Sequence, residues 1–405
     1  MSHINTAKKQ NNIIIVGAGP VGLVVALRLT QNGIPVTILE ESSAPIAEPR
    51  ASTFHPPTLD MLDTLGLSQS LLSLGRIAEK WQYSIFETGE NAVFDLGVLK
   101  DETKHPYRLQ CEQVHLVRAA AKELNRLAPK ALIYNAKVTK IGENSVGPWV
   151  DADINGTKER FNGRWLVGAD GSNSIVRREL GLTFTGQTYP AASIAIGTTF
   201  PFEKYIPNIC GVNYFWAEGW SFSMFQTKKL WRVGYSLPKG MSDSLATSSD
   251  EIQNKLRKIY PSKTPFRLET ARVYRVHRRT VDTFRVKSIL LTGDAAHLNS
   301  PSGGMGMNSG IHDAFNLTDK LISIFKNRAD EGILDQYSRQ RRFAATADIQ
   351  RASDQNHKLH REQDYKARLK TLHTMQNIAN DSQKLLDFVR ESSLINSIKR
   401  ANLIN

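Results

Sequence analysis

A strand, a glycine-rich loop and a helix follow one another near the start of the chain, and this order constrains the fold more than any other feature. Residues 13–16 (IIIV) are typical of a buried strand, and the loop Gly17-Ala18-Gly19-Pro20-Val21-Gly22 comes directly after them. Apolar residues then recur at helical spacing over 23–29. A G-x-G-x-x-G loop in this context predicts a βα unit that binds a dinucleotide.

The loop residues have separate physical tasks. Gly17 permits the tight turn, Gly19 lets a diphosphate approach the backbone, and Gly22 lets the helix pack closely on the strand. The helix N-terminus adds free N–H groups and the positive end of the helix dipole. We therefore expect the cofactor to be bound by Gly17, Gly19, Pro20 and Gly22.

An acidic residue ends the second predicted strand, 36–39. This residue is Glu40, which lies 18 residues after Gly22. A carboxylate at this place accepts hydrogen bonds from a ribose diol and repels a 2′-phosphate. The site is therefore predicted to hold FAD or NAD and not NADP, and the loop by itself does not distinguish the first two.

A second pattern, far along the chain, favours FAD. The strand-like run 289–292 leads into Gly293-Asp294, and a glycine-rich loop at 301–310 precedes a helical run over 311–325. An Asp at the end of a strand binds ribose or ribityl hydroxyl groups, and a loop that runs into a helix collects backbone N–H groups at one point. Such a helix N-terminus stabilises the negative charge of a reduced flavin.

The stretch from Gly293 to Leu317 closely resembles a known signature, GDAAH…P…G-x-G-x-N-x-G…DA-x-NL. This signature is typical of the class A flavoprotein monooxygenases, which have the para-hydroxybenzoate hydroxylase fold. The resemblance implies that Pro301 lies beside the flavin and the substrate as a catalytic-site residue. It also implies that FAD is bound by Asp294, Gly304, Gly306, Met307 and Asn308. The chain departs from the family at 318–321 (TDKL in place of Ala-Trp-Lys-Leu), which we expect to alter helix packing only.

Three further segments are similar to motifs of the same family. Residues 165–177 contain Asp170 in an Asp-Gly turn that supports FAD and the pyridine nucleotide in the family; here Asp170 either contacts a ligand or only holds the turn. Arg50 resembles the Arg that lies along the FAD phosphates or ribityl chain, and Gln110 resembles the Gln that contacts the flavin. With these segments, the resemblance covers residues 13 to about 320.

The order of patterns predicts an α/β fold: a Rossmann-like FAD-binding domain with a parallel sheet, an interleaved and mainly antiparallel substrate-domain sheet, and a helical C-terminal tail. After Gly332 the chain contains no glycine or proline, as is typical of long helices. The expected parts are a flexible leader at 1–12, the first part of the FAD-binding domain at 13–180, the substrate-binding sheet at 181–282, the completion of the FAD-binding domain at 283–332, and C-terminal helices at 333–405.

The middle segment supplies candidates for the substrate site. Tyr214, Trp216, Ser223 and Phe225 alternate along strand-like runs and are predicted to cover the ring end of the flavin, with an ordinary sheet core as the alternative. His55 follows the predicted phosphate-binding Arg in a segment that runs near the flavin in relatives. There it would deprotonate or hydrogen-bond a phenol, or be an ordinary loop histidine. We expect no metal site.

The resemblance also implies a reaction. NADH or NADPH reduces FAD, O2 adds at the flavin C4a atom, and the C4a-hydroperoxyflavin transfers one oxygen atom to an electron-rich ring. We expect an aromatic substrate of the phenol, aminoaryl or heteroaryl type. The alternatives are a quinone-precursor or antibiotic-type substrate, a flavoprotein that oxidises NAD(P)H to peroxide without hydroxylation, and a non-catalytic FAD-binding or membrane-associated protein.

The composition limits the class of protein. Two cysteines, Cys111 and Cys210, exclude a disulfide framework and indicate a reducing, cytoplasmic setting. The formal net charge of +13 comes from basic residues spread along the chain. This favours a generally basic surface over an anionic partner such as a dinucleotide, a carboxylate substrate, an acidic membrane surface or nucleic acid. No apolar run is long enough for a membrane-spanning helix. We expect a monomer or a homodimer.

Overall fold

A parallel sheet forms the base of the predicted dinucleotide fold in the computed structural model, which describes residues 11–45 and 51–405. The strand order is β20-β21-β12-β1-β2-β8, and every neighbouring pair is parallel except β20 with β21. The strands are β1 (Ile13–Val16), β2 (Val36–Leu39), β8 (Leu132–Ile133), β12 (Trp165–Gly168), β20 (Arg285–Val286) and β21 (Ile289–Leu291). From β1 the chain first adds β2 on one side and later adds β12 on the other, so the strand order reverses at β1. Open α/β sheets bind their ligands at the carboxyl ends of the strands at such a point.

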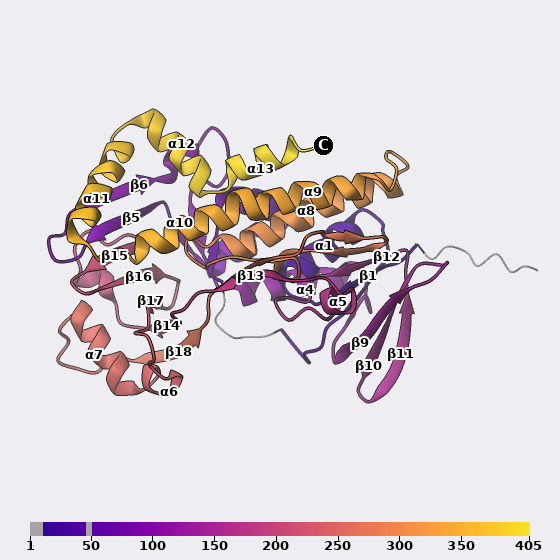
Figure 1. Cartoon of the computed structure of the whole chain (residues 1–405), viewed down its shortest axis with the longest axis horizontal. Helices are drawn as coiled ribbons and strands as arrows, with labels where there is room; N and C mark the ends of the chain where they lie inside the picture. The colour runs from indigo at the N-terminus through magenta and orange to yellow at the C-terminus, as the bar shows by residue number, and fades with distance from the viewer. Residues whose placement is uncertain (1–10, 46–50) are drawn as a thin grey trace, which may run out of the picture.

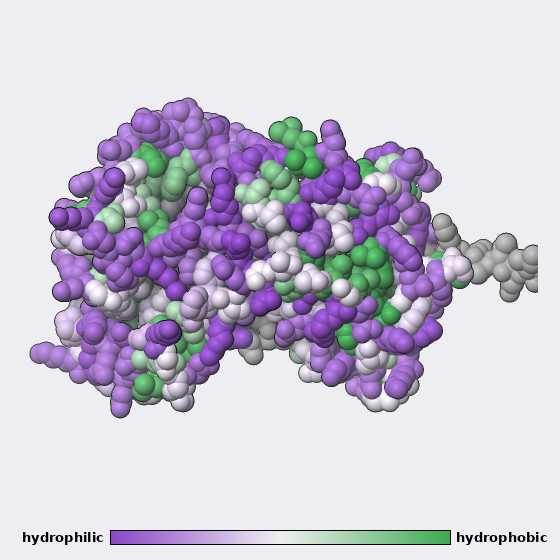
Figure 2. All heavy atoms as spheres, in the orientation of Figure 1, coloured by the Kyte–Doolittle hydropathy of each residue, from purple (hydrophilic) through white to green (hydrophobic). Residues whose placement is uncertain are grey.

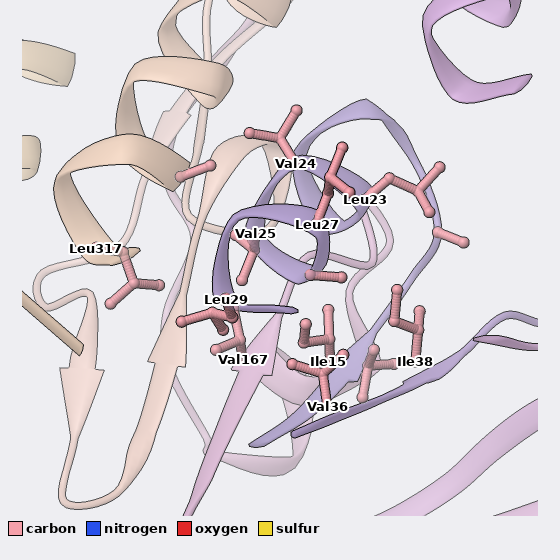
Figure 3. Packing of buried hydrophobic residues seen from close by; sticks show 14 of the residues in the cluster. Ile15, Leu23, Val24, Val25, Leu27, Leu29, Val36, Ile38, Val167 and Leu317 are labelled. Carbon is pink, nitrogen blue, oxygen red and sulfur yellow. The ribbon is translucent and has the colours of Figure 1, made fainter. Parts of the chain in front are cut away.

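Helix α1 (Pro20–Gln31) packs on this sheet through a fully apolar face. Figure 3 shows Leu29 of α1 close to Ile15, Val36 and Val167 of three neighbouring strands, with Leu317 of α8 (Met305–Phe325) in the same cluster. Side chains on all four strand positions of β1 are buried, as expected for a strand covered on both faces. Burial of this apolar surface is what stabilises the predicted βα unit.

A second sheet is mainly antiparallel, and its strand order is β18-β14-β17-β16-β15-β5-β6. Its strands are β5 (Lys80–Ile85), β6 (Asn91–Asp95), β14 (Ser193–Thr198), β15 (Val212–Ala217), β16 (Trp220–Gln226), β17 (Trp231–Ser236) and β18 (Leu268–Tyr274). The predicted antiparallel sheet is therefore confirmed. It also takes in β5 and β6 from earlier in the chain, because β5 pairs in parallel with β15.

The remaining elements connect or cover these two sheets. The smaller sheets combine β3 (Thr53–Phe54), β4 (Arg76–Ala78) and β7 (Arg108–Gln110); β9 (Ala136–Glu143), β10 (Pro148–Ile154) and β11 (Thr157–Asn162); and β13 (Thr185–Thr188), β19 (His277–Thr280) and β22 (His297–Leu298). The connecting helices are α2 (Pro56–Asp63), α3 (Ser68–Leu74), α4 (Gln113–Leu127), α5 (Ile175–Glu179), α6 (Asp243–Ala246) and α7 (Ser249–Ile259). Short 3₁₀ turns are η1 (Leu96–Leu99), η2 (Phe202–Lys204) and η3 (Gly293–Ala295).

The C-terminal tail is helical, as predicted. It comprises α9 (Ile333–Phe343), the π-helical segment η4 (Ala344–Gln350), α10 (Arg351–His360), α11 (Tyr365–Ala379), α12 (Ser382–Ser392) and α13 (Ile395–Asn402). Figure 1 shows α8 and α9 running side by side, with α11 next to β5 and β6. Leu372 and Met375 of α11 are buried against Trp81 and Tyr83 of β5, so this helix face packs on the second sheet.

The visible surface in Figure 2 is mostly hydrophilic, and its hydrophobic side chains form separate patches. Within residues 11–45 and 51–405, no helix has the length and apolar character needed to cross a lipid bilayer.

Three segments meet around one side chain, Val21, at the start of α1. A Cβ atom added to Gly293 would lie 3.0 Å from Val21 Cγ2, and one added to Gly310 would lie 2.7 Å from the same atom. The Cβ position of Gly310 is also 3.3 Å from the Cα atom of Gly293. These two glycines therefore allow the start of α1, the Gly293-Asp294 turn and helix α8 to pack directly against one another.

Gly310→Ala is expected to lower the free energy of unfolding by about 1–3 kcal/mol, because the new methyl group overlaps Val21 in a packed core. Denaturant unfolding of the FAD-free protein measures this change. Adding Val21→Ala removes the overlapping atom and should recover part of the loss. Gly332→Ala is the control, since no described atom lies within 4 Å of the added Cβ. An equal loss in the control would contradict the packing explanation.

Candidate FAD and substrate site

The carboxyl ends of three parallel strands bring the predicted cofactor motifs together. These ends are Val16 of β1, Gly168 of β12 and Leu291 of β21. A Cβ atom added to Gly17 would lie 2.6 Å from the carbonyl oxygen of Ala169, and Gly17 has a positive φ of 97°. Gly17 is thus required both for the turn and for contact with the Asp170 segment.

The N-terminus of α1 is open toward this end of the sheet. Gly19 is the N-cap residue, and no side chain caps the helix. Apart from Gly19 and its immediate neighbours in the chain, no atom of the described residues lies within 4 Å of a Cβ added to Gly19, whereas one added to Gly22 would lie 2.0 Å from the Gly17 carbonyl oxygen. Gly22 therefore serves helix packing, and Gly19 leaves space beside uncapped N–H groups that suit a diphosphate.

Glu40 is oriented at the end of β2 by three hydrogen bonds. One carboxylate oxygen accepts from the Ala18 N–H at 2.6 Å, and the other accepts from the Ser42 N–H at 3.0 Å and the Ser42 hydroxyl at 2.6 Å. These bonds hold the carboxylate beside the glycine-rich loop. Its remaining lone pairs fit the predicted bonds to a ribose diol.

A buried ionic network holds the Gly293-Asp294 turn. Asp313 of α8 accepts from the Gly293 N–H at 3.1 Å and from His297 Nε2 at 2.7 Å, and its other oxygen accepts from Arg341 Nε at 2.5 Å. Burial alone raises the pKa of Asp313, but Arg341 and His297 outweigh it and hold the pKa below its usual value. The network thus fixes the turn, while Asp294 itself is exposed at the carboxyl end of β21.

The N-terminus of α8 is bound to the segment that follows β2. Gly304 caps the helix in the left-handed conformation (φ 68°), without a side-chain cap. The Asn308 amide donates to the carbonyl oxygens of Thr53 at 2.8 Å and Gly304 at 2.6 Å, and accepts from the His55 N–H at 2.9 Å. Asn308 is fully buried, so its conformation joins α8 to residues 53–55. Met307 is also buried, and Gly306 is half-buried.

Gln110 Nε2 and Asp170 Oδ1 are among the buried polar atoms that have no hydrogen-bond partner within the residues described. The Gln110 oxygen accepts from the Thr53 hydroxyl at 3.0 Å, but its Nε2 has no partner. Asp170 Oδ2 accepts from the Val176 N–H at 3.1 Å, but Oδ1 has none. Burial raises the pKa of Asp170. Since buried polar groups are normally satisfied, these atoms, with the open space at Gly19, fit an extended polar cofactor such as FAD.

His55 is fully buried beneath the loop before α8. Its Nε2 donates to the Gly303 carbonyl oxygen at 3.0 Å, because a carbonyl only accepts, and this leaves Nδ1 as an acceptor. Burial, with Arg108 nearby, holds the pKa of His55 well below its usual value. The imidazole is thus neutral, and within the described chain Nδ1 has no partner. Its predicted contact with a phenol stays a prediction.

The four predicted substrate residues lie on one face of the antiparallel sheet. Tyr214 pairs with Ser223 across β15 and β16, and Trp216 and Phe225 each lie two residues further along their strands. Since side chains alternate along a strand, all four share a face. Burial raises the pKa of the Tyr214 hydroxyl overall, but the Gly303 backbone lies close enough to lower it, so this face reaches the loop before α8. Contact with a substrate stays a prediction.

Three residues that no sequence motif pointed to lie next to this face. Tyr83 of β5 stacks on Tyr214 with a centroid distance of 4.9 Å and an interplanar angle of 22°. The ring of His360, at the end of α10, lies 4.8 Å from the Tyr214 ring. Arg108 lies over Trp81 at 4.8 Å, and burial lowers the pKa of its guanidinium. They belong to no motif, because only strand pairing and the packing of α10 bring them here.

Arg50 and Pro301 are the two remaining residues that the sequence predicted for the site. Arg50 lies outside the described residues. Pro301 is exposed, and its carbonyl oxygen accepts from the Gly304 N–H at 2.9 Å, which closes a turn at the start of α8. The turn lies next to Gly303, and so next to Tyr214 and His55.

Comparison with known proteins gives consistent results. The profile of the family described as FAD binding domain matches residues 10–352. The chain is similar to 6-hydroxy-3-succinoylpyridine 3-monooxygenase of Pseudomonas putida, with 30% identity over 94% of this chain and 97% of that protein. It is also similar to para-nitrophenol 4-monooxygenase of a Pseudomonas species, with 31% identity over 82% of this chain and 83% of that protein.

A solved structure has the same fold. The crystal structure of p-nitrophenol 4-monooxygenase from Pseudomonas putida superposes on this chain with a TM-score of 0.86 and 27% identity, over 95% of this chain and 97% of that one. The predicted α/β fold, with a parallel FAD-binding sheet, an antiparallel second sheet and a helical tail, is confirmed.

Asp294→Ala is expected to weaken FAD binding by about tenfold or more, because a carboxylate at the end of β21 is predicted to bind a cofactor hydroxyl group. Titration of the FAD-free protein with FAD, followed by flavin fluorescence, measures the dissociation constant. Asp319→Ala removes a carboxylate of the same helix-and-turn region that pairs with Arg28 at 2.6 Å, and serves as the control. Equal FAD affinity in Asp294→Ala and wild type would show that the motif is assigned wrongly.

Gln110→Met keeps the side-chain length and removes the unpartnered amide donor. We expect FAD binding to weaken by about tenfold, because the cofactor supplies the missing acceptor. Unfolding of the FAD-free protein should change by less than about 1 kcal/mol, since the lost hydrogen bond from Thr53 is offset by the removal of a buried donor that has no partner. A large loss of stability with unchanged FAD affinity would instead assign Gln110 to the protein core.

Proposed function

This chain belongs to the FAD binding domain family and is an FAD-dependent aromatic monooxygenase, and on that premise we propose that its substrate is a single phenol or hydroxypyridine ring. The co-substrates are O2 and NADH or NADPH, as is typical of the family.

The names of the two relatives support the choice of ring. Para-nitrophenol and 6-hydroxy-3-succinoylpyridine are both single six-membered rings that carry a hydroxyl group and a substituent para to it. In both names, the number given to the oxygenation is that of the substituted carbon. A ring hydroxyl raises the electron density at the para carbon, which favours attack by an electrophilic oxygen. We therefore infer that this chain oxygenates the carbon para to a hydroxyl group.

The observation that carries the proposal is the contact between the aromatic sheet face and the loop before α8. The Tyr214 hydroxyl lies near the backbone of Gly303, and Tyr83, Trp216 and Phe225 lie around Tyr214. This face is mainly aromatic, and the polar side chains of His360 and Arg108 lie beside it, which is a composition found in small-molecule sites. A planar ring held there lies next to the predicted flavin loop.

The described residues have separate tasks in the reaction. The uncapped N-terminus of α1 binds the diphosphate, Glu40 binds a ribose, and Gln110 donates its free amide hydrogen to the cofactor. When bound, FAD accepts two electrons from NAD(P)H and activates O2. The N-terminus of α8 stabilises negative charge, and α10 to α12 exclude water from the aromatic face.

The overall reaction balances with one NAD(P)H and one O2. Where the para carbon carries hydrogen, substrate, O2, NAD(P)H and a proton give the hydroxylated ring, NAD(P)⁺ and water. Where the carbon carries a group that leaves as an anion, the ring ends as a quinone with the same consumption of O2 and NAD(P)H. One oxygen atom enters the ring in both cases, and the other leaves as water.

The test is NAD(P)H oxidation by the FAD-loaded enzyme with a panel of phenols, aminobenzoates, hydroxypyridines and polycyclic aromatic compounds. We expect one of the hydroxylated single rings to accelerate oxidation by about tenfold or more, with one product molecule formed per NAD(P)H. Mass spectrometry identifies the product, and ¹⁸O2 places one labelled atom on the ring. Acceleration only by polycyclic compounds, or conversion of all electrons to hydrogen peroxide with every ring, would contradict the proposal.

A further inference from the structure

One face of helix α10 lies along the candidate substrate site. Asn356 Nδ2 is 2.9 Å from the place of a Cβ atom on Gly303, so this side chain touches the loop before α8. One residue further, His357 Nδ1 is 3.3 Å from the Ser300 hydroxyl. One turn further, His360 meets Tyr214. Residues three and four apart share a helix face, so α10 forms a wall from the loop to the sheet.

The end of α10 is fixed in place by the second sheet. Trp216 Nε1 donates to the Leu359 carbonyl oxygen at 3.0 Å. Just beyond the helix, Arg368 donates to the Ala217 carbonyl oxygen at 2.8 Å and to the Glu362 carbonyl oxygen at 2.7 Å. These bonds hold the backbone around His360 on both sides, so the position of its imidazole is set by the fold.

His360 is half-buried as a residue, but both of its ring nitrogens are buried and their hydrogen-bonding capacity is unused. Neither Nδ1 nor Nε2 has a partner anywhere in the described parts of the chain. Burial, followed by His357 and Arg361 nearby, lowers the pKa of His360 to about 3. A neutral imidazole offers one N–H donor and one acceptor nitrogen. A buried polar side chain without partners is rare in native proteins, and a ligand that supplies the partners explains it.

The surroundings of His360 match an aromatic ring with a polar edge. The rings of Tyr83 and Tyr214 lie 6.1 Å and 4.8 Å from the imidazole, both nearly perpendicular to it. Arg361 Nη2 is a second buried donor without a partner within the residues described. Arg361 is close enough to lower the pKa of His360, and its cation favours a partial negative charge on a nearby ligand oxygen.

We propose that His360 is a substrate-binding residue of this enzyme and that its acceptor nitrogen receives the hydrogen bond of the substrate's ring hydroxyl group. The proposal rests on the proposed function, and it names the group that selects a hydroxylated ring. A neutral acceptor in an apolar site discriminates strongly against a ring that lacks the donor hydrogen, because the imidazole then stays unpaired. The hydrogen bond also increases the electron density that the oxygen donates to the para carbon.

The test compares a phenol with its methyl ether, which has the same ring and no donor hydrogen. The first pair is 4-nitrophenol and 4-nitroanisole; the phenol that most accelerates NAD(P)H oxidation and its methyl ether form the second. Dissociation constants come from the change in flavin absorbance of the FAD-loaded enzyme. We expect wild type to bind the phenol about tenfold more tightly than the ether, as one buried hydrogen bond gives.

His360→Phe keeps an aromatic ring and removes both nitrogens. We expect it to weaken phenol binding about tenfold, leave ether binding unchanged and retain FAD. His360→Asn keeps an acceptor atom and should recover part of the preference. His373→Phe replaces an exposed histidine of α11 and should behave as wild type.

The proposal is overturned if His360→Phe keeps the tenfold preference, or if both ligands weaken equally in it, which would make His360 a packing residue only. A different result bears on the proposed function. If no hydroxylated ring binds to wild type or accelerates its NAD(P)H oxidation, the proposed substrate class fails, and the His360 proposal fails with it.

Discussion

The close contact around Val21 is the constraint on which the cofactor site depends. The glycine-rich loop and the Gly293-Asp294 turn are far apart in the sequence, and each carries only part of a dinucleotide site. They meet because Gly293 and Gly310 lack the Cβ atoms that would collide with Val21. Asp313 then locks the turn by binding Gly293, His297 and Arg341 at once. The missing Cβ atoms of Gly293 and Gly310 and the buried ionic network of Asp313 therefore act together to place the two motifs on one edge of the parallel sheet.

The substrate side is built by a different kind of interaction. The antiparallel sheet presents an aromatic face, and strand pairing places Tyr83, Tyr214 and Ser223 in one row. His55 donates a hydrogen bond to the Gly303 carbonyl oxygen, and the Tyr214 hydroxyl lies near the same residue, so this face adjoins the start of α8. The C-terminal helices then cover the same face, with α11 and α12 supplying apolar side chains and α10 supplying polar ones. The site is thus assembled from elements drawn from most of the length of the chain.

Much of the cofactor half was predictable because its requirements are local. A tight turn needs Gly17 and close helix packing needs Gly22, and the structure shows both. Glu40 lies beside the loop at the end of the next strand, where it is predicted to bind a ribose. The alternation of Tyr214, Trp216, Ser223 and Phe225 likewise predicted a shared face, which the pairing of β15 with β16 confirms. The participation of β5 was not predictable, since its parallel pairing with β15 joins segments with no common pattern.

The sequence by itself determined the fold class, FAD as the cofactor and the reaction class, because those depend on backbone conformations and residue spacings that leave a signature along the chain. Only the tertiary structure decided which side chains gather around Tyr214 on the aromatic face. Tyr83, Arg108 and His360 stand in no motif, and they become neighbours through the pairing of β5 and the docking of α10. The same is true of the unpartnered nitrogens of His360 and Gln110. Whether a polar atom is buried without a partner is a property of packing, and no pattern of residue types along a chain specifies it.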